Sequence, residues 1–400
     1  MLEITPGGCM ERLIRLEPEI RDSIIEMGGE DVAKCYQCGR CMPACPWNCL
    51  ENIEYLVYRY PQAVKLGDII NSEDKAELEK EVTDIFRCVG CDNCLAECPR
   101  GVNISDVLRA VRRILVDYGS YPNEMKDIVS RSSSYGNPLG EPADKRASWA
   151  ENSGIPRFKS GFDYLYNPCC IPAYDTRATK IARATGEILK VAGVSFGVLG
   201  GEESCCGEAV RRVGAEEVFQ DLAHRNIDSY KNFNVKTVLT TSPHCSLVFS
   251  REYPKFGAQF VSLHISQLLY QLLEDKRITP QKPFNRKVVY HDPCTLGRQL
   301  GIYEEPRGLL RSVPGLELVE IPVFNRKYSI CCGGGSAGVW YDWPKDERLA
   351  DFRIKQVINT GAQVLAVACP YCLQMFEETI KSIGVEMEVM DIAEILHQSL

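Results

Sequence analysis

The six residues VACPYC, at 367–372, decide the fold of this chain, because an earlier stretch, TTSPHC at 240–245, repeats them. Cys369 and Cys372 of the later copy correspond to Ser242 and Cys245 of the earlier one. Further pairs keep nearly the same spacing: Phe249 with Phe376, Gly257 with Gly384, Ile265 with Ile392, and Cys205-Cys206-Gly207 with Cys331-Cys332-Gly333. This self-similarity predicts two tandem domains of one fold, which we place at 161–278 and 284–400.

Within each copy, helical stretches alternate with short apolar segments, a pattern typical of α/β domains with parallel sheets. The segment 176–193 is predicted to be a helix that ends at Gly193. The predicted strands are VSFGVLG (194–200), VKTVLTT (235–241), VVYHD (288–292), LELVEI (316–321), AQVLAVA (362–368) and VEMEVMD (385–391). Residues 131–160 are rich in Ser, Gly and Pro and are predicted to form an irregular linker before the first repeat.

The first third of the chain carries two cysteine runs, CYQCGRCMPACP at 35–46 and CVGCDNCLAECP at 88–99. Both read C-x2-C-x2-C-x3-C-P, the ferredoxin spacing in which three close thiolates hold one [4Fe–4S] cubane and the fourth reaches the other. A four-cysteine zinc site usually uses two separate C-x2-C pairs, so zinc fits this pattern poorly. The predicted ligand sets are Cys35, Cys38, Cys41 and Cys98 for one cubane, and Cys88, Cys91, Cys94 and Cys45 for the other.

Two amphipathic helices are predicted around these runs, one over 72–86 with Ser72 as its N-cap and one from Ile104 with Ser105 as its N-cap. We therefore expect residues 1–130 to form a helical, ferredoxin-like domain. Cys9 and Cys49 lie outside both runs and are predicted to be structural. The expected architecture is α+β or α/β overall: a helical domain with two [4Fe–4S] cubanes followed by two tandem α/β domains.

The second repeat brings five cysteines from three loops, each of which follows an apolar strand. Ligand sites in α/β folds gather at the carboxyl ends of strands, so these thiols are expected to converge. A disulfide between Cys331 and Cys332 would leave the other three unexplained, and five thiolates exceed the four that tetrahedral zinc takes. The pattern favours an iron–sulfur cluster held by Cys294, Cys331, Cys332, Cys369 and Cys372.

The cysteine spacing around CCG resembles the CCG-domain family. The order of two cubanes followed by two CCG repeats resembles the heterodisulfide reductase catalytic subunit with a fused ferredoxin region. Proteins of sulfite-reduction, benzoyl-CoA reductase and glycolate oxidase complexes are similar. The resemblance implies a noncubane [4Fe–4S] cluster that cleaves disulfides at the five-cysteine motif. Segments that carry it are CIPAYD (170–175), LGGEESCCGEAVRRVG (199–214), SPHC (242–245), HISQLL (264–269) and HDPCTLGR (291–298).

In the first repeat, Ser242 stands where the motif has a cysteine, and three interpretations are open. The remaining thiols, Cys170, Cys205, Cys206 and Cys245, suffice for an ordinary cubane, which we rank first because serine is a poor substitute for a soft ligand. Cys169 could serve as a fifth ligand and restore a noncubane cluster. Alternatively, the site holds no cluster and its cysteines are packed thiols.

Splitting a disulfide takes two electrons, which the clusters deliver one at a time. Cations near the second site could orient an anionic substrate or raise the cluster potential, and His291, Arg298 and His244 are the candidates. Arg211 and Arg212 are weaker candidates, since an arginine near a helix start is more often an ion-paired surface group. The competing hypothesis is a pure electron-transfer subunit without a substrate of its own.

Composition narrows the remaining options. The chain has 400 residues, 20 cysteines and a net charge of −8, with no basic block, so nucleic acid is not an expected partner. No export signal or long apolar run is evident, which predicts cytoplasmic residence, compatible with docking at the inner face of a membrane. The GGGSAGVW stretch (333–340) does not match a dinucleotide-binding loop. Electrons are therefore expected from a flavin- or haem-containing partner subunit, and the substrate is a small thiol or disulfide.

Overall fold

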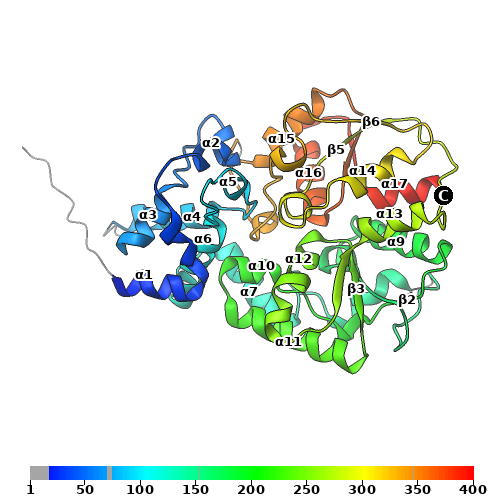
Figure 1. Ribbon diagram of the computed structural model, residues 1–400, viewed down its shortest axis with the longest axis horizontal. Helices are drawn as coiled ribbons and strands as arrows, with labels where there is room; N and C mark the ends of the chain where they lie inside the picture. The colour runs from blue at the N-terminus through cyan, green and yellow to red at the C-terminus, as the bar shows by residue number, and fades with distance from the viewer. Residues whose placement is uncertain (1–17, 70–73, 152, 345) are drawn as a thin grey trace, which may run out of the picture.

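The computed structural model describes residues 18–69, 74–151, 153–344 and 346–400. It has three parts (Figure 1): a helical domain at the N-terminal side, and two α/β domains that face each other across a layer of helices. The predictions for Cys9 and Ser72 lie outside the described residues.

The helical domain contains α1 (Pro18–Ile24), α2 (Cys41–Ala44), α3 (Arg59–Leu66), α4 (Lys75–Arg87), α5 (Asn93–Ala96), α6 (Ile104–Asp117) and α7 (Asn123–Tyr135), with short π- or 3-10 turns at Ile25–Gly29, Glu30–Lys34 and Pro46–Cys49.

Both predicted helices of this domain are present, but their N-caps differ from the prediction. The Asp74 carboxylate caps α4 by accepting hydrogen bonds from the backbone N–H groups of Ala76 and Glu77. Asn103 caps α6, and Ser105 instead lies inside the first turn, where its hydroxyl donates to Asp92 Oδ1 at 2.6 Å. Asn and Ser are about equally good caps, so their order along the chain could not decide between them.

The first α/β domain has a four-stranded parallel sheet in the order β2-β1-β3-β4. Of the strand predicted over 194–200, Phe196–Gly197 forms β2 at the sheet edge, and Val198 adds an isolated parallel bridge to Arg157. Its elements are β1 (Tyr164–Asn167), α8 (Cys170–Tyr174), α9 (Thr179–Val191), β2 (Phe196–Gly197), α10 (Glu208–Val213), α11 (Glu216–Asn232), β3 (Thr237–Thr240), α12 (Pro243–Arg251), β4 (Val261–His264) and α13 (Ile265–Glu274), with 3-10 turns at Gly200–Glu202 and Tyr253–Phe256.

The second α/β domain repeats this topology with the strand order β6-β5-β7-β8, again all parallel. Its elements are β5 (Lys287–Tyr290), a π-helical turn (Thr295–Gln299), α14 (Glu304–Arg311), β6 (Glu317–Val319), α15 (Leu349–Ile358), β7 (Val364–Val367), α16 (Pro370–Ile383), β8 (Glu388–Asp391) and α17 (Ile392–Ser399), with 3-10 turns at Arg326–Tyr328 and Gly338–Trp340. The α/β class and the parallel sheets predicted from the sequence are thus confirmed.

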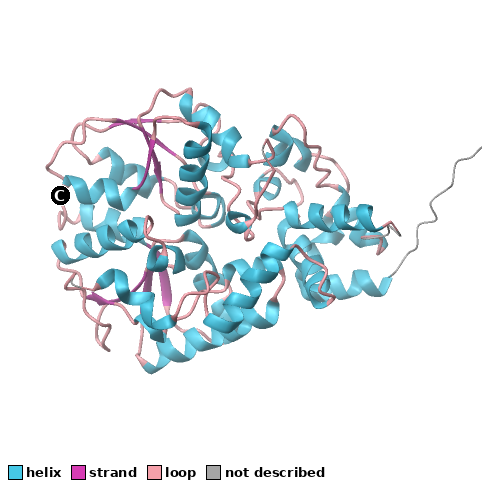
Figure 2. Ribbon diagram, turned by 180° about the vertical axis from the view of Figure 1, so that it is seen from behind, coloured by secondary structure: helices cyan, strands magenta, loops and turns pink. Residues whose placement is uncertain are grey.

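Equivalent positions of the two repeats have equivalent structural roles. Phe249 and Phe376 are fully buried in α12 and α16, and Ile265 and Ile392 each begin a helix. His264 and Asp391 are the N-caps of those helices. Helix α9 packs on α17 while its counterpart α14 packs on α13, so the two domains meet through matched contacts (Figures 1 and 2).

The segment predicted to be an irregular linker contains helical turns and buried side chains in the part that the structure describes, which leaves out residue 152. Helix α7 continues into it as far as Tyr135, and a 3-10 helix spans Ala143–Ala150. Trp149 is buried, with its ring edge against Tyr166 at a centroid distance of 5.6 Å. Burial of this aromatic surface, together with the hydrogen bond from buried Arg146 to Cys170 and its ion pair with Glu203, outweighs the turn-forming composition of the segment.

Candidate iron–sulfur sites

The eight ferredoxin-type cysteines divide into two groups in the way that the crossed spacing predicts. One small cavity is lined by Cys35, Cys38, Cys41 and Cys98, and a second cavity by Cys45, Cys88, Cys91 and Cys94. In each group, three thiols from one run meet a fourth thiol from the other run. Each cavity therefore has the ligand set that a [4Fe–4S] cubane needs.

The two cubane sites differ in exposure. Cys38 is exposed, and Tyr36 beside it keeps 60% of its surface accessible. Cys45 and Cys91 of the other set are buried. The first cavity therefore lies nearer to solvent, and the second lies toward the α/β domains.

The five cysteines of the second repeat converge as expected from strand ends. Cys294 follows β5, Cys369 follows β7, and the CCG loop lies between β6 and α15. The sulfurs of Cys294 and Cys331 are 3.7 Å apart, and those of Cys332 and Cys372 are 3.3 Å apart. Cys369 interacts with Cys372, and all five side chains are at most 7% exposed. We call this group the second thiol site.

His291 faces this site from the end of β5. Its ring nitrogen and the sulfurs of Cys332 and Cys372 lie within 4.8 Å of one another. Arg353 Nε donates to His291 Nδ1 at 3.3 Å, so the ring proton lies on Nε2. Burial lowers the pKa of His291 below its usual value, which keeps the imidazole neutral.

His244 reaches the second thiol site from the first repeat. Its Nδ1 lies 3.1 Å from Glu208 Oε1, and its side chain also interacts with Cys369. Burial opposes protonation, but Glu208 and then Cys369 raise the pKa of His244 well above its usual value. In return, and against the effect of burial, Cys372 and His244 lower the pKa of Cys369 to about 6. The site therefore includes a cation from the neighbouring domain.

Arg298 lies between the second thiol site and the ferredoxin loops. Its Nε donates to the carbonyl of Cys91 at 2.8 Å, and its Nη1 to that of Ser329 at 2.6 Å. The adjacent Gln299 donates to the Gly90 carbonyl at 2.9 Å. These bonds let Arg298 hold the helical domain and the second α/β domain together. Its guanidinium also places a positive charge near Cys294 and Cys331.

Arg211 and Arg212 are held by carboxylates. Arg211 pairs with Glu252 at 2.7 Å, and Arg212 lies 3.5 Å from Glu208. Arg212 also approaches Asp106 of the helical domain at 3.8 Å. Both guanidinium groups are thus ion-paired, but the prediction of a surface position near a helix start is wrong, because they lie buried in the last turn of α10.

A side-chain interaction joins one of the ferredoxin-type sites to the second thiol site. The side chains of Cys91 and Cys331 interact, and this contact, with Arg298, lowers the pKa of Cys91 to about 6 against the effect of burial. Cys91 belongs to the buried cubane set, and Cys331 to the five-cysteine set. Ligands of two neighbouring sites are therefore in direct contact.

The first repeat holds a second buried group of thiols. Cys170, Cys205, Cys206 and Cys245 are all at most 8% exposed. Arg146, from the segment predicted to be a linker, donates from Nη1 to Cys170 Sγ at 3.3 Å. Nothing in the sequence marked Arg146, because a lone arginine in a Ser- and Pro-rich stretch carries no spacing signal. We call this group the first thiol site.

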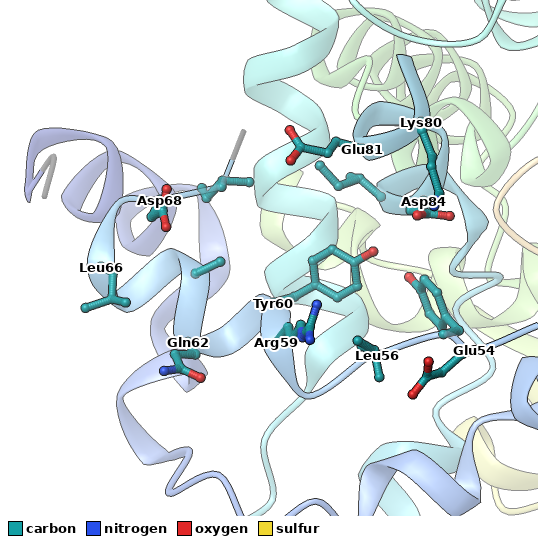
Figure 3. A pocket seen from close by; sticks show the side chains of 14 residues that line it. Glu54, Leu56, Arg59, Tyr60, Gln62, Leu66, Asp68, Lys80, Glu81 and Asp84 are labelled. Carbon is teal, nitrogen blue, oxygen red and sulfur yellow. The ribbon is translucent and has the colours of Figure 1, made fainter. Parts of the chain in front are cut away.

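Thiolates are soft ligands, and such groups of buried thiols suit iron–sulfur clusters. The second thiol site has one sulfur more than tetrahedral zinc uses. A pocket of about 720 Å³ lies elsewhere, between α3 and α4 (Figure 3). Its described lining combines polar and charged side chains, with Arg59, Lys80 and Asp84 around Tyr60, with aliphatic ones such as Leu56, and includes no cysteine. This pocket is therefore separate from the sulfur sites.

Comparison with known protein families agrees with this organisation. Residues 31–102 match the 4Fe–4S dicluster domain, and residues 164–250 and 288–377 match the cysteine-rich domain CCG. These matches assign [4Fe–4S] clusters as cofactors of the chain. No helix among the described residues is long and apolar enough to cross a membrane.

Three relatives place the chain among iron–sulfur oxidoreductases. It is 28% identical to EtfAB:quinone oxidoreductase of Syntrophomonas wolfei, over 92% of this chain and 58% of that protein. It is 31% identical to the probable iron-sulfur-binding oxidoreductase FadF of Bacillus subtilis, over 84% and 48%. It is 28% identical to one subunit of the dihydromethanophenazine:CoB–CoM heterodisulfide reductase of Methanosarcina barkeri, over 92% and 93%. The chain thus spans only about half of the first two relatives but nearly all of the third.

Proposed function

Since the chain belongs to the iron–sulfur proteins that join a 4Fe–4S dicluster domain to two cysteine-rich CCG domains, we propose that it is a thiol–disulfide oxidoreductase subunit. Electrons enter through the two cubanes of the dicluster domain. Redox chemistry on a small thiol or disulfide takes place at the second thiol site, on a noncubane [4Fe–4S] cluster held by its five cysteines.

The contact between Cys91 and Cys331 is the observation that carries this proposal. Cys91 would hold the buried cubane and Cys331 the cluster of the second thiol site, so these ligands would bring the two clusters close enough for electron transfer without a further carrier. The exposed Cys38 set lies at the other end of the helical domain, where a donor protein can approach. The exposed cubane thus serves as the entry point.

Reduction of a disulfide consumes two electrons and two protons and yields two thiols. The clusters, when bound, supply the electrons singly. A ring nitrogen of His291 lies within 4.8 Å of the sulfurs of Cys332 and Cys372, and His244, whose pKa is raised, lies against Cys369. A protonated side chain beside the sulfurs is what thiol formation requires, whereas a simple electron relay requires none.

A second candidate function is electron transfer alone. It is favoured by the burial of all five sulfurs of the second thiol site. It also fits the name of the Syntrophomonas relative, in which electrons pass to a quinone. In that case the chain would pass electrons between a flavin- or haem-containing donor and an acceptor subunit.

For either function we propose that the chain works as one subunit of a larger redox complex. Its location is cytoplasmic, with docking at the inner face of the membrane as an option that its relatives' quinone and phenazine names support. The partners are other redox subunits and, for the first function, a small disulfide.

Anaerobic turnover of the purified holoprotein tests the two functions. The CoB–CoM heterodisulfide and a short alkyl disulfide serve as substrates, with a reduced viologen as donor. Thiol production that is lost in Cys372→Ser but kept in Cys49→Ser supports the first function. Reduction of all clusters without thiol production from either probe supports the relay and rejects disulfide chemistry.

A further inference from the structure

The first thiol site contains a fifth cysteine in an unusual place. Cys169 precedes α8 and is only 5% exposed. Its backbone has φ 79° and ψ 161°, a region that residues other than glycine almost never occupy. A strained conformation of this kind persists only where the surroundings impose it, and such positions concentrate at functional sites.

Two hydrogen bonds hold the Cys169 loop in this conformation. The backbone N–H of Cys169 donates to Asn167 Oδ1 at 3.0 Å. The hydroxyl of Thr241 donates to the carbonyl of Pro168 at 2.5 Å. Because Thr241 precedes Ser242 and Pro168 precedes Cys169, the second bond ties the Cys169 loop to the loop that lost its cysteine.

The thiols of the two sites interact in the same order. In the second site the order is Cys294, Cys331, Cys332, Cys372 and Cys369. In the first site it is Cys170, Cys205, Cys206, Cys245 and Cys169. Cys169 therefore interacts with Cys245 in the first site as Cys369 interacts with Cys372 in the second. Cys245 is the counterpart of Cys372, so Cys169 takes the place of Cys369.

Ser242, the sequence counterpart of Cys369, does not fill this place. Its side chain is fully buried, and its hydroxyl lies near the Cys245 thiol without a hydrogen bond of ordinary geometry among the described residues. A hydroxyl is also a hard donor that binds iron–sulfur clusters less well than a thiolate does. Position 242 is therefore buried like its counterpart Cys369, but it supplies no sulfur.

We propose that Cys169 replaces the cysteine missing at position 242, so that the first thiol site holds its cluster with five thiolates rather than four. The ligand set is Cys169, Cys170, Cys205, Cys206 and Cys245. The first thiol site is then of the same class as the second thiol site, and the two differ in that one ligand of the first comes from a different loop. This inference rests on the proposed presence of a cluster in the first repeat, but not on disulfide turnover at the second.

Three variants of the anaerobically purified holoprotein test the assignment. Cys169→Gly suits the backbone conformation and removes the sulfur. Cys169→Gly combined with Ser242→Cys returns a sulfur at the original position of the repeat. Cys49→Ala removes a partly buried cysteine outside every set and serves as the control. Iron and sulfide content, together with Mössbauer and electron paramagnetic resonance spectra, report on each cluster without need of activity.

We expect Cys169→Gly to change or lose one spectral component of the wild type, the double variant to restore it, and Cys49→Ala to leave it intact. An unchanged spectrum and iron content in Cys169→Gly would overturn the assignment. Loss without restoration in the double variant would also count against it, because the two positions are proposed to be interchangeable. Thiol production by the same proteins is a separate readout, so failure of the proposed function would leave this result standing.

Discussion

His244 and Tyr371, which occupy the same position in the two repeats, stack on each other with their ring centroids 4.5 Å apart. Each residue lies between the proline and the final cysteine of its own Cys/Ser-Pro-x-Cys segment, and each reaches toward the thiols of the other repeat. The two equivalent residues therefore meet at the interface between the domains. The pair joins the two thiol sites across the domain interface.

This stacking should appear as a coupling energy. In a double-mutant cycle with His244→Leu and Tyr371→Leu, we expect a coupling of about 0.5–1.5 kcal/mol in the free energy of unfolding. The cost of removing His244 from Glu208, which keeps Arg212 as a partner, enters both His244 variants and cancels. As a control, His224→Leu, on the exposed face of α11, should be additive with Tyr371→Leu to within about 0.5 kcal/mol. Additivity of the first pair would show that the stack contributes no stability.

The glycine-rich loop after Cys332 allows the close approach of the dicluster domain. A Cβ at Gly335 would overlap the carbonyl oxygen of Val89, which lies between two cubane ligands. Gly335→Ala should therefore push the domains apart, destabilise the fold by about 1–3 kcal/mol, and slow reduction of the second-site cluster. Gly201→Ala, where the nearest contact is 3.1 Å, is the matched control. Rapid mixing with reductant followed by freeze-quench spectroscopy measures the rate, and an unchanged rate in Gly335→Ala contradicts the role of this contact.

Arg146 places a buried positive charge against the first thiol site. Arg146→Met removes the hydrogen bond to Cys170, so the less negative, oxidised cluster should gain in relative stability. Because both oxidation states lose this bond of about 1.5–3 kcal/mol, the fall in the one-electron potential is at most about 60–130 mV. Arg157→Met, which breaks an exposed ion pair with Glu202, should leave the potential unchanged. Redox titration followed by electron paramagnetic resonance checks both variants, and equal potentials would reject the electrostatic role of Arg146.

His264 should make stability sensitive to acid. Its Nδ1 accepts from Ser266 N–H, and burial lowers its pKa to about 4, from about 6.5 in an unfolded chain. Between the two pKa values the unfolded state binds more protons than the folded state does. The free energy of unfolding therefore falls as the pH drops below about 6.5, and it is lower by about 1.4 kcal/mol at about pH 5.5. His264→Asn keeps a capping side chain that does not titrate there. Anaerobic denaturant unfolding at several pH values should show the smaller acid dependence in the variant, and equal slopes would contradict this role.

Much of this organisation follows from spacing in the sequence. Thiols at fixed intervals predict which cysteines meet, because the geometry of a cluster leaves few alternatives. The match of Phe249 with Phe376 indicated equivalent core positions for the same reason: each repeat must bury the same helix face. Contacts of this kind are local or periodic, and a single sequence displays them.

Other features depend on tertiary contacts that have no periodic signal. Arg146 becomes a neighbour of Cys170 only because a 3-10 helix packs against α8. The contact of Cys91 with Cys331 depends on how the helical domain docks. Cys169 could be recognised as an alternative ligand in the sequence, but its strained backbone and its place beside Cys245 became visible only in three dimensions.

The five-residue turn Thr295–Gln299 directly follows Cys294 and also binds the ferredoxin loop through Arg298 and Gln299. Cys294 and Cys91 are thus carried by backbone segments that are fastened to each other and move together. Electron tunnelling slows steeply with distance, so a rigid clamp of this kind fixes the gap between donor and acceptor while other loops of the protein adjust. Any rearrangement that displaces Cys294 would therefore also change the rate of electron transfer from the cubane.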